Sequence, residues 1–147
     1  YPLWETLSAL GMPLTTHSGS VNFPNFCSNY ADPSGWSQVA WDFPKLRIVI
    51  AHMGADYHNQ AVVIAESCAN VWLDTAYLHW FCPRLLPEVT PAQLVSRAVR
   101  FAGAESVVFA SEGMTPQFIW DNLDVSFEAR KRVLWKNALE IIGEPEV

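Results

Sequence analysis

Leu46-Arg47-Ile48-Val49-Ile50-Ala51-His52-Met53-Gly54 is the stretch of sequence that decides the fold. Its aliphatic core has no polar residue at alternate positions, a pattern typical of a strand that is buried on both faces of a parallel sheet. The run ends on His52, and the following glycine marks a turn. The carboxyl ends of parallel strands are where α/β barrels and open α/β sheets hold their reactive side chains. His52 is therefore a candidate catalytic residue, with a core histidine bonded to a backbone carbonyl as the alternative.

The composition is that of one globular domain. The chain has 147 residues, of which 50% are hydrophobic and 16% charged, and its formal net charge is −6. We therefore predict a single domain over residues 1–147, with neither nucleic acid nor a membrane as a partner. No apolar run approaches the length of a membrane span, which is about 20 residues. The three widely spaced cysteines, Cys27, Cys68 and Cys82, favour a reduced, cytoplasmic protein over a disulfide scaffold.

Four short apolar runs alternate with amphipathic stretches along the chain. The predicted strands cover residues 13–17, 46–51, 71–75 and 107–110. The predicted helices cover residues 1–10, 32–43, 57–68, 90–103 and 126–142. Thr90-Pro91-Ala92-Gln93 is a capping box with proline at the first helical position, which is a strong helix start signal. Residues 21–31 and 76–89 are expected to be loops, and residues 114–125 are ambiguous. This alternation predicts right-handed parallel βα units.

Apolar stripes mark the core-facing sides of the first and last predicted helices. The first stripe consists of Leu3, Leu7 and Leu10, and Gly11 stands at the C-cap position. The last stripe consists of Phe127, Leu134, Ala138 and Ile141, and Gly143 stands at the C-cap position. Stripes with this spacing pack against the core of a domain.

Each predicted strand ends on a residue that can do chemistry: His17, His52, Asp74 and Glu112. Because the carboxyl ends of parallel strands lie at one edge of a sheet, we expect all four side chains on the same side. Two imidazoles and a carboxylate suit zinc or another divalent transition ion. For Asp74 a structural role at the strand end is favoured over a ligand role.

These segments make the chain similar to the C-terminal half of the amidohydrolase family 2 barrels, relatives of aminocarboxymuconate-semialdehyde decarboxylase. The matching segments are PLTTHSG (13–19), FPKLRIVIAHMG (43–54), NVWLDT (70–75), FASE (109–112) and NALEIIG (137–143). The resemblance implies an α/β fold, namely the C-terminal half of a TIM (β/α)8 barrel with strands five to eight and their helices. A length well short of the about 250 residues of closed barrels agrees with half a barrel.

The resemblance also implies roles for individual residues. His17 would be a metal ligand, and His52 would orient or activate the attacking water beside the metal. Glu112 stands where most of the family has aspartate, and it would serve both as a metal ligand and in catalysis. The metal would be divalent, with zinc expected, and an N-terminal half with an H-x-H pair would supply further ligands. Apart from the resemblance, Arg84 and His79 are candidates for binding a substrate carboxylate, although solvated loop positions are the favoured interpretation.

The activity that the resemblance implies is that of a metal-dependent hydrolase or decarboxylase (carboxy-lyase) acting on a small organic acid. One alternative is a hydratase of the 4-oxalomesaconate type, a branch that carries glutamate at the position of Glu112. Another, from a different class, is an inactive half-barrel or an interaction module. An isolated half would have two open sheet edges and an uncovered apolar face, which predicts either a homo-oligomer or association with an N-terminal half-barrel.

Overall fold

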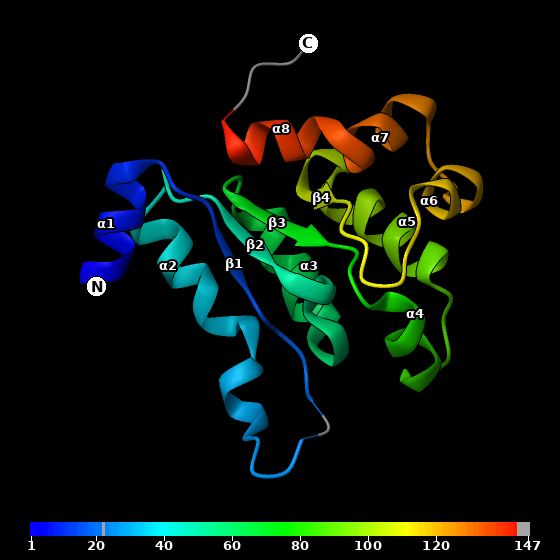
Figure 1. Ribbon diagram of the computed structural model, residues 1–147, viewed down its shortest axis with the longest axis horizontal. Helices are drawn as coiled ribbons and strands as arrows, with labels where there is room; N and C mark the ends of the chain where they lie inside the picture. The colour runs from blue at the N-terminus through cyan, green and yellow to red at the C-terminus, as the bar shows by residue number, and fades with distance from the viewer. Residues whose placement is uncertain (22, 144–147) are drawn as a thin grey trace.

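The computed structural model describes residues 1–21 and 23–143, and its centre is one parallel sheet (Figure 1). The strands are β1 (Leu14–Thr16), β2 (Ile48–Ile50), β3 (Val71–Asp74) and β4 (Val107–Val108), and they lie side by side in that order. All three pairings are parallel, with Thr16 beside Ile50 and Ile50 beside Leu73. Sequential parallel strands of this kind form the wall of a βα barrel. The prediction of four parallel strands is confirmed.

Helices follow each strand, as the sequence predicts. They are α1 (Pro2–Leu10), α2 (Trp36–Asp42), α3 (His58–Ser67), α4 (Leu78–Phe81), α5 (Pro91–Ala102), α6 (Pro116–Asn122), α7 (Phe127–Lys131) and α8 (Asn137–Ile142). A π-helical turn, Arg132–Lys136, joins α7 to α8. At α5 the capping box forms: the Thr90 hydroxyl accepts from the Gln93 N–H, and the Gln93 side chain accepts from the Thr90 N–H. The capping signal in the sequence therefore marks the true start of this helix.

Two segments differ from the loop and helix assignments made from sequence. The predicted loop 76–89 contains α4, because Leu78 and Phe81 turn inward and are buried. The ambiguous stretch 114–125 contains α6, which begins after a Thr115 cap and buries Ile119. Both helices are short, and each is fixed by tertiary burial of one or two apolar side chains.

The main core lies between the sheet and the helices behind it, α2, α3 and α5 (Figure 1). Ile48, Ile50 and Leu73 are fully buried on this side of the strands. On the opposite side, Ile141 of α8 packs on Val49 and Trp72 in a second, smaller apolar cluster. The C-terminal helix thus covers part of the sheet face that the sequence-based prediction leaves open.

The two sheet edges differ from each other. At β4, the Phe109 N–H donates to the Val133 carbonyl at 2.7 Å. The Asn137 side chain donates to the Val107 carbonyl, also at 2.7 Å, so backbone groups on this edge have partners. Within the described residues β1 pairs with β2 alone. Within the described residues β4 also pairs with one strand alone, but Val133 and Asn137 cover part of its outer edge.

The predicted stripes of α1 and of the last helix are only partly correct. Leu3 and Leu10 are 58% and 67% exposed, whereas Trp4 packs on Trp36 of α2 with ring centroids 5.4 Å apart. The physical reason is that α1 packs beside α2, so that its core-facing side carries Trp4 and Leu7 and leaves Leu3 and Leu10 outside (Figure 1). Phe127 is 57% exposed, because its ring lies against Trp120 at the surface.

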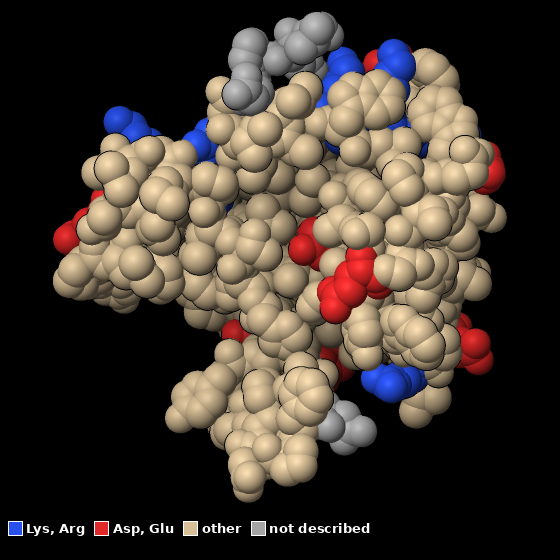
Figure 2. Space-filling view, viewed as in Figure 1, with Lys and Arg blue, Asp and Glu red and all other residues tan. Residues whose placement is uncertain are grey.

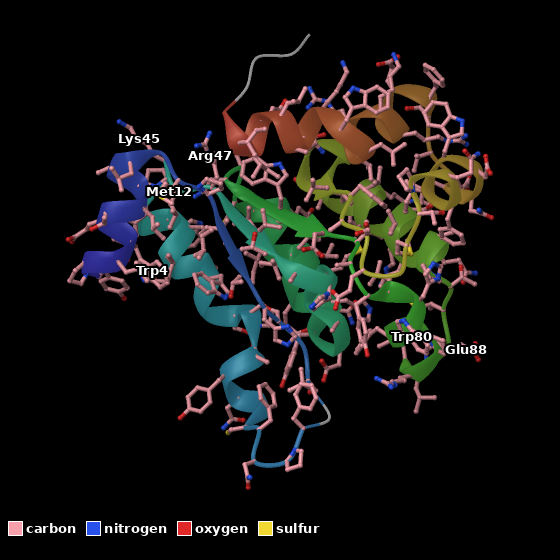
Figure 3. The ribbon with its side chains drawn as sticks, viewed as in Figure 1. Trp4, Met12, Lys45, Arg47, Trp80 and Glu88 are labelled. Carbon is pink, nitrogen blue, oxygen red and sulfur yellow. The ribbon has the colours of Figure 1, made fainter. Side chains whose placement is uncertain are left out.

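Arg47 holds the first and last helices together. Its guanidinium donates to the Gly11 carbonyl at the end of α1 and to the Glu140 carbonyl in α8. Figure 3 shows Arg47 beside Met12, at the junction of these segments. A cation at helix C-termini also interacts favourably with the helix dipoles. The segments at the two ends of the described chain are therefore fixed to the same end of the sheet.

Charge is unevenly distributed over the surface of this acidic chain. Figure 2 shows basic side chains along the rim formed by α7 and α8, where the sequence has Arg130, Lys131, Arg132 and Lys136. Acidic side chains lie nearer the centre of the same face (Figure 2). None of the described helices has the length and hydrophobicity needed to cross a membrane.

Candidate active site

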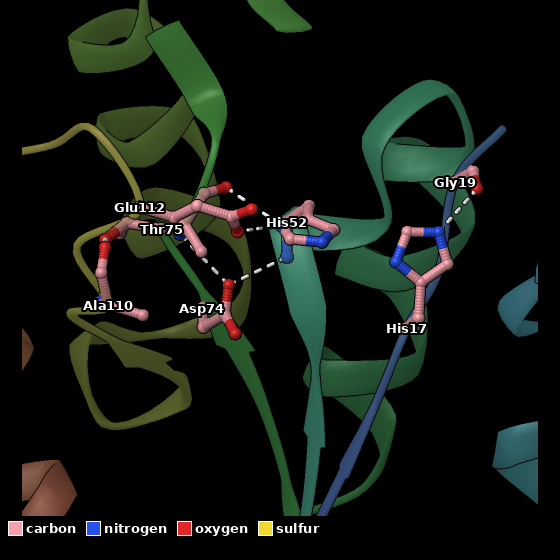
Figure 4. Close-up of polar contacts among 8 residues, drawn as sticks. His17, Gly19, His52, Asp74, Thr75, Ala110 and Glu112 are labelled. Atoms are coloured by element: carbon pink, nitrogen blue, oxygen red, sulfur yellow. Dashed lines mark hydrogen bonds and ion pairs between the residues drawn. The ribbon is translucent and has the colours of Figure 1, made fainter. Parts of the chain in front are cut away.

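His17 follows β1 directly and faces the next strand. Its Nε2 lies 3.0 Å from the Gly19 carbonyl oxygen. A carbonyl can only accept a hydrogen bond, so Nε2 carries the ring proton and Nδ1 keeps a lone pair. The rings of His17 and His52 meet edge to face, with centroids 5.1 Å apart (Figure 4).

His52 sits at the end of β2 on a backbone that turns left-handed. His52 has φ 58°, and Met53 and Gly54 continue the turn with φ 51° and 78°. The His52 Nδ1 lies 3.1 Å from the Ala76 carbonyl, which places the ring proton on Nδ1 and leaves Nε2 as the basic nitrogen. The side chain is 14% exposed, and Nδ1 lies 3.7 Å from Oε2 of Glu112. His52 is therefore oriented by the protein and still reachable from solvent.

Asp74 hydrogen-bonds to the backbone of the loop that carries His52. Its Oδ1 accepts from the backbone N–H of His52 at 2.7 Å and from that of Ala76 at 3.0 Å. The side chain is almost fully buried, and this burial raises the pKa of the Asp74 carboxyl, although the two backbone hydrogen bonds oppose the shift. Asp74 thus has the structural role that the sequence favours, because it bonds to the backbone of the loop after β2 instead of facing the cleft.

Glu112 reaches the same place from the end of β4. The Thr75 hydroxyl donates to the Ala110 carbonyl and accepts from the Ala110 N–H, each at 3.0 Å (Figure 4). This pair of bonds fixes the end of β4 against β3. Glu112 follows two residues later with φ 30°, and its side chain is 57% exposed. Its carboxylate is therefore open to solvent, and Oε2 lies 3.7 Å from Nδ1 of His52.

A cleft of about 640 Å³ brings these residues together. Four of the five site residues predicted from the sequence line it: His17, His52, Arg84 and Glu112. The fifth, His79, packs edge to face on Phe118 at 5.1 Å and is not among the lining residues. Aromatic lining residues that the sequence analysis did not single out are Phe23, Phe26, Tyr77 and Phe81. No periodic sequence pattern identifies these four residues as cleft-lining, because they lie in loops and in a short helix.

Backbone strain is concentrated around this cleft. In the described residues, positive φ at non-glycine positions occurs at Asn25, His52, Met53, Ala55, Tyr77 and Glu112. All but Asn25 lie in the loops that follow β2, β3 and β4. Such conformations cost about 1–3 kcal/mol each and occur mainly where a site needs them. The strain is an independent reason to place the functional site here.

The donor types at this cleft fit a transition metal, but this chain offers only part of a site. His17 and His52 each keep one ring nitrogen with a lone pair, and Glu112 adds a carboxylate. Across residues 1–21 and 23–143, no group of three or more His, Cys, Asp or Glu side chains is arranged to hold an ion. Cys82 does not add a ligand to this set, because burial raises the pKa of its thiol to about 11.

Sequential parallel βα units with histidines and a carboxylate at the strand ends are typical of βα-barrel proteins, whose reactive residues lie at the carboxyl face. The chain matches the amidohydrolase family model over residues 1–143 and belongs to that family. No curated protein matches it significantly.

Solved structures show the same fold. An uncharacterised TIM-barrel protein from Bordetella bronchiseptica aligns with TM-score 0.76 and 20% identity, over 97% of this chain and 50% of that one. The 5-carboxyvanillate decarboxylase of Sphingomonas paucimobilis aligns with TM-score 0.66 and 19% identity, over 99% and 53%. A dihydroxybenzoic acid decarboxylase from Polaromonas, with bound manganese, aligns with TM-score 0.61 and 19% identity, over 97% and 53%. The chain spans about half the length of these structures, as expected for half a TIM barrel.

Proposed function

We propose that the barrel containing this chain is a metal-dependent carboxy-lyase that acts on a small organic acid. The observation that carries the proposal is the meeting of His17, His52 and Glu112 in one cleft at the carboxyl ends of the strands. The named decarboxylases of similar fold support carboxy-lyase chemistry over the hydrolase alternative. Arg84 and the aromatic residues of the same cleft suit a flat acid with one carboxylate.

His17 and Glu112 would hold a divalent metal, with the other ligands coming from a complementary half of the barrel. Zinc is the ion expected from the donor types, and the manganese of the Polaromonas enzyme makes Mn²⁺ the second candidate. When bound, the metal would supply Lewis acidity to a substrate oxygen. Arg84 would bind the carboxylate of the acid through its planar guanidinium.

His52 would move the proton in this reaction. Loss of CO₂ breaks the bond between the carboxylate carbon and the rest of the acid, and the electron pair stays on the substrate carbon. A proton must then reach that carbon. The Ala76 carbonyl holds Nδ1 of His52, so the proton would be carried and delivered by Nε2. Histidine suits this role because imidazole gains and loses a proton near neutral pH.

A complementary half-barrel is the partner we propose for this chain. Among the described residues β1 pairs on one side only, so its other side is open for a further strand. The β4 edge is blocked by Val133 and Asn137, so these groups would have to release it before a closed barrel could form. The competing proposal, an interaction module without activity, is favoured by the incomplete donor set.

The test is an assay of CO₂ release by the intact protein from a panel of small aromatic and aliphatic acids. We expect activity that disappears with a chelator and returns with Zn²⁺ or Mn²⁺. His17→Ala should lose both metal content and activity, whereas the control His79→Ala should keep both. An intact protein that holds metal but releases no CO₂ from any acid would exclude the carboxy-lyase, and absence of both would favour the interaction module.

A further inference from the structure

The two loops that carry the histidines are joined by a hydrogen-bonded contact in addition to the pairing of their strands. The loop after β1 carries His17, and the loop after β2 carries His52. The Asp56 carboxylate accepts from the Ser20 N–H at 2.7 Å and from the Ser20 hydroxyl at 2.5 Å. The two residues are 36 positions apart, and both are exposed. A carboxylate that accepts two hydrogen bonds from one residue fixes both the distance and the orientation of that residue.

A second, independent contact brings the same loops together without polar groups. A Cβ placed on Gly19 would lie 2.2 Å from the Cβ of Ala55, so only glycine allows this approach. Gly19 has φ 111°, and Ala55, with φ 51° and ψ −120°, is itself strained. Strain of this kind persists only where the surroundings hold it. The loops are therefore held closer than their backbones would adopt by themselves.

Both contacts involve residues close in sequence to the two histidines. On one side, Asp56 binds Ser20, and the carbonyl of the preceding residue, Gly19, is the hydrogen-bond partner of the His17 ring. On the other side, Ala55 ends the run of positive-φ residues that begins at His52, and Asp56 is the next residue along the chain. The rings themselves are 5.1 Å apart. A small shift of either loop would change the distance between the two rings, even if the strands kept their pairing.

We propose that Asp56 is a positioning residue that fixes the spacing of His17 and His52 by holding the loop after β1 against the loop after β2. It touches neither ring. Its effect on turnover rests on the proposed function, whereas its effect on ring spacing does not. Rates depend strongly on the position of reacting groups, and a displacement of about 1 Å can cost about 10²-fold.

The test compares Asp56→Ala, Asp56→Asn and the control Asp42→Ala in the intact protein. Asp42 is also an exposed carboxylate, and it accepts from Gln38 within α2, away from the cleft. In Asp56→Ala we expect hydrogen exchange of the Ser20 amide to speed up about tenfold or more, because a charge-assisted bond is lost. The nuclear Overhauser contact between the His17 and His52 ring protons should weaken as well. Asp56→Asn keeps an acceptor oxygen and should restore most of both signals, and Asp42→Ala should change neither.

Activity adds a separate measurement. If the carboxy-lyase proposal is correct, Asp56→Ala should lower kcat about tenfold or more with little change in thermal midpoint, because both partners are exposed. If the protein proves inactive, the exchange and ring-contact measurements still decide the role of Asp56. Wild-type ring contact and wild-type Ser20 exchange in Asp56→Ala would overturn the inference. So would a loss of thermal stability that Asp56→Asn does not restore.

Discussion

Replacing Asp74 by alanine tests how the loop after β2 is held. The change removes the carboxylate oxygen that accepts hydrogen bonds from the N–H groups of His52 and Ala76. Each N–H left without an acceptor costs about 1–3 kcal/mol, which gives about 2–6 kcal/mol for the two. Removing a carboxylate from an almost fully buried position offsets part of this cost. We expect Asp74→Ala to lower the free energy of unfolding by about 3 kcal/mol.

Urea unfolding followed by tryptophan fluorescence measures this difference. Asp74→Asn keeps an oxygen that can accept both bonds, so its loss should stay below about 1 kcal/mol. The exposed control Asp121→Ala should change stability by no more than about 0.5 kcal/mol, since Asp121 only bonds Gln117 on α6. Wild-type stability in Asp74→Ala, or a greater loss in Asp74→Asn than in Asp74→Ala, would refute this explanation of the loop.

The same carboxyl predicts a pH dependence with a definite sign. Burial raises the pKa of Asp74 above its ordinary value of 3.8, so the folded protein binds this proton more tightly than the unfolded chain. Its contribution to stability is complete below pH 3.8 and is lost as the pH rises through the folded pKa. Asp74→Asn lacks this titration. The stability of Asp74→Asn relative to wild type should therefore increase from pH 3.8 upwards and level off above the folded pKa.

Three further changes test the site and the sheet edge. His52→Asn in the intact protein should keep its metal content but lose about 10²–10⁴-fold in kcat, the usual effect of a positioned acid or base, and unchanged turnover would return His52 to the core-histidine alternative. Arg84→Gln should raise KM for acids about tenfold or more with a smaller change in kcat, measured by initial rates, because one charge-assisted contact is lost. Asn137→Ala should lower the free energy of unfolding in urea by about 3 kcal/mol, because the buried side chain donates to both Ala104 and Val107, and a loss below about 1 kcal/mol would contradict that role.

The sheet and the strand-end residues are predictable from sequence for a local reason. A buried parallel strand reads as an uninterrupted apolar run, as in Ile48–Ile50, and the polar residue that ends the run is visible beside it. Strand order follows as well, because consecutive βα units usually lie side by side. These two rules place His17, His52 and Glu112 at one edge with no knowledge of side-chain contacts.

Burial that depends on distant segments could not be predicted in the same way. Leu3, Leu7 and Leu10 have the spacing of a core stripe, but of the three only Leu7 packs on the core, where Trp4 joins it. Likewise, the stripe of the last helix does not show which face of the sheet it covers. Ile141 covers the face with Val49, a choice fixed by contacts between residues more than 90 positions apart.

The residues that orient the candidate site side chains are harder to find in the sequence than the strand-end residues themselves. His52 is visible in the sequence because it ends a strand, but its orientation comes from the Asp74 carboxylate and the Ala76 carbonyl on the next strand's loop. Asp56 follows the turn after β2 as an ordinary polar loop residue, and only its contact with Ser20 gives it a role. Loop-to-loop hydrogen bonds have no period and no fixed spacing. A change in such a supporting residue is therefore expected to alter the proposed reaction while the strand-end pattern that marks the candidate site stays intact.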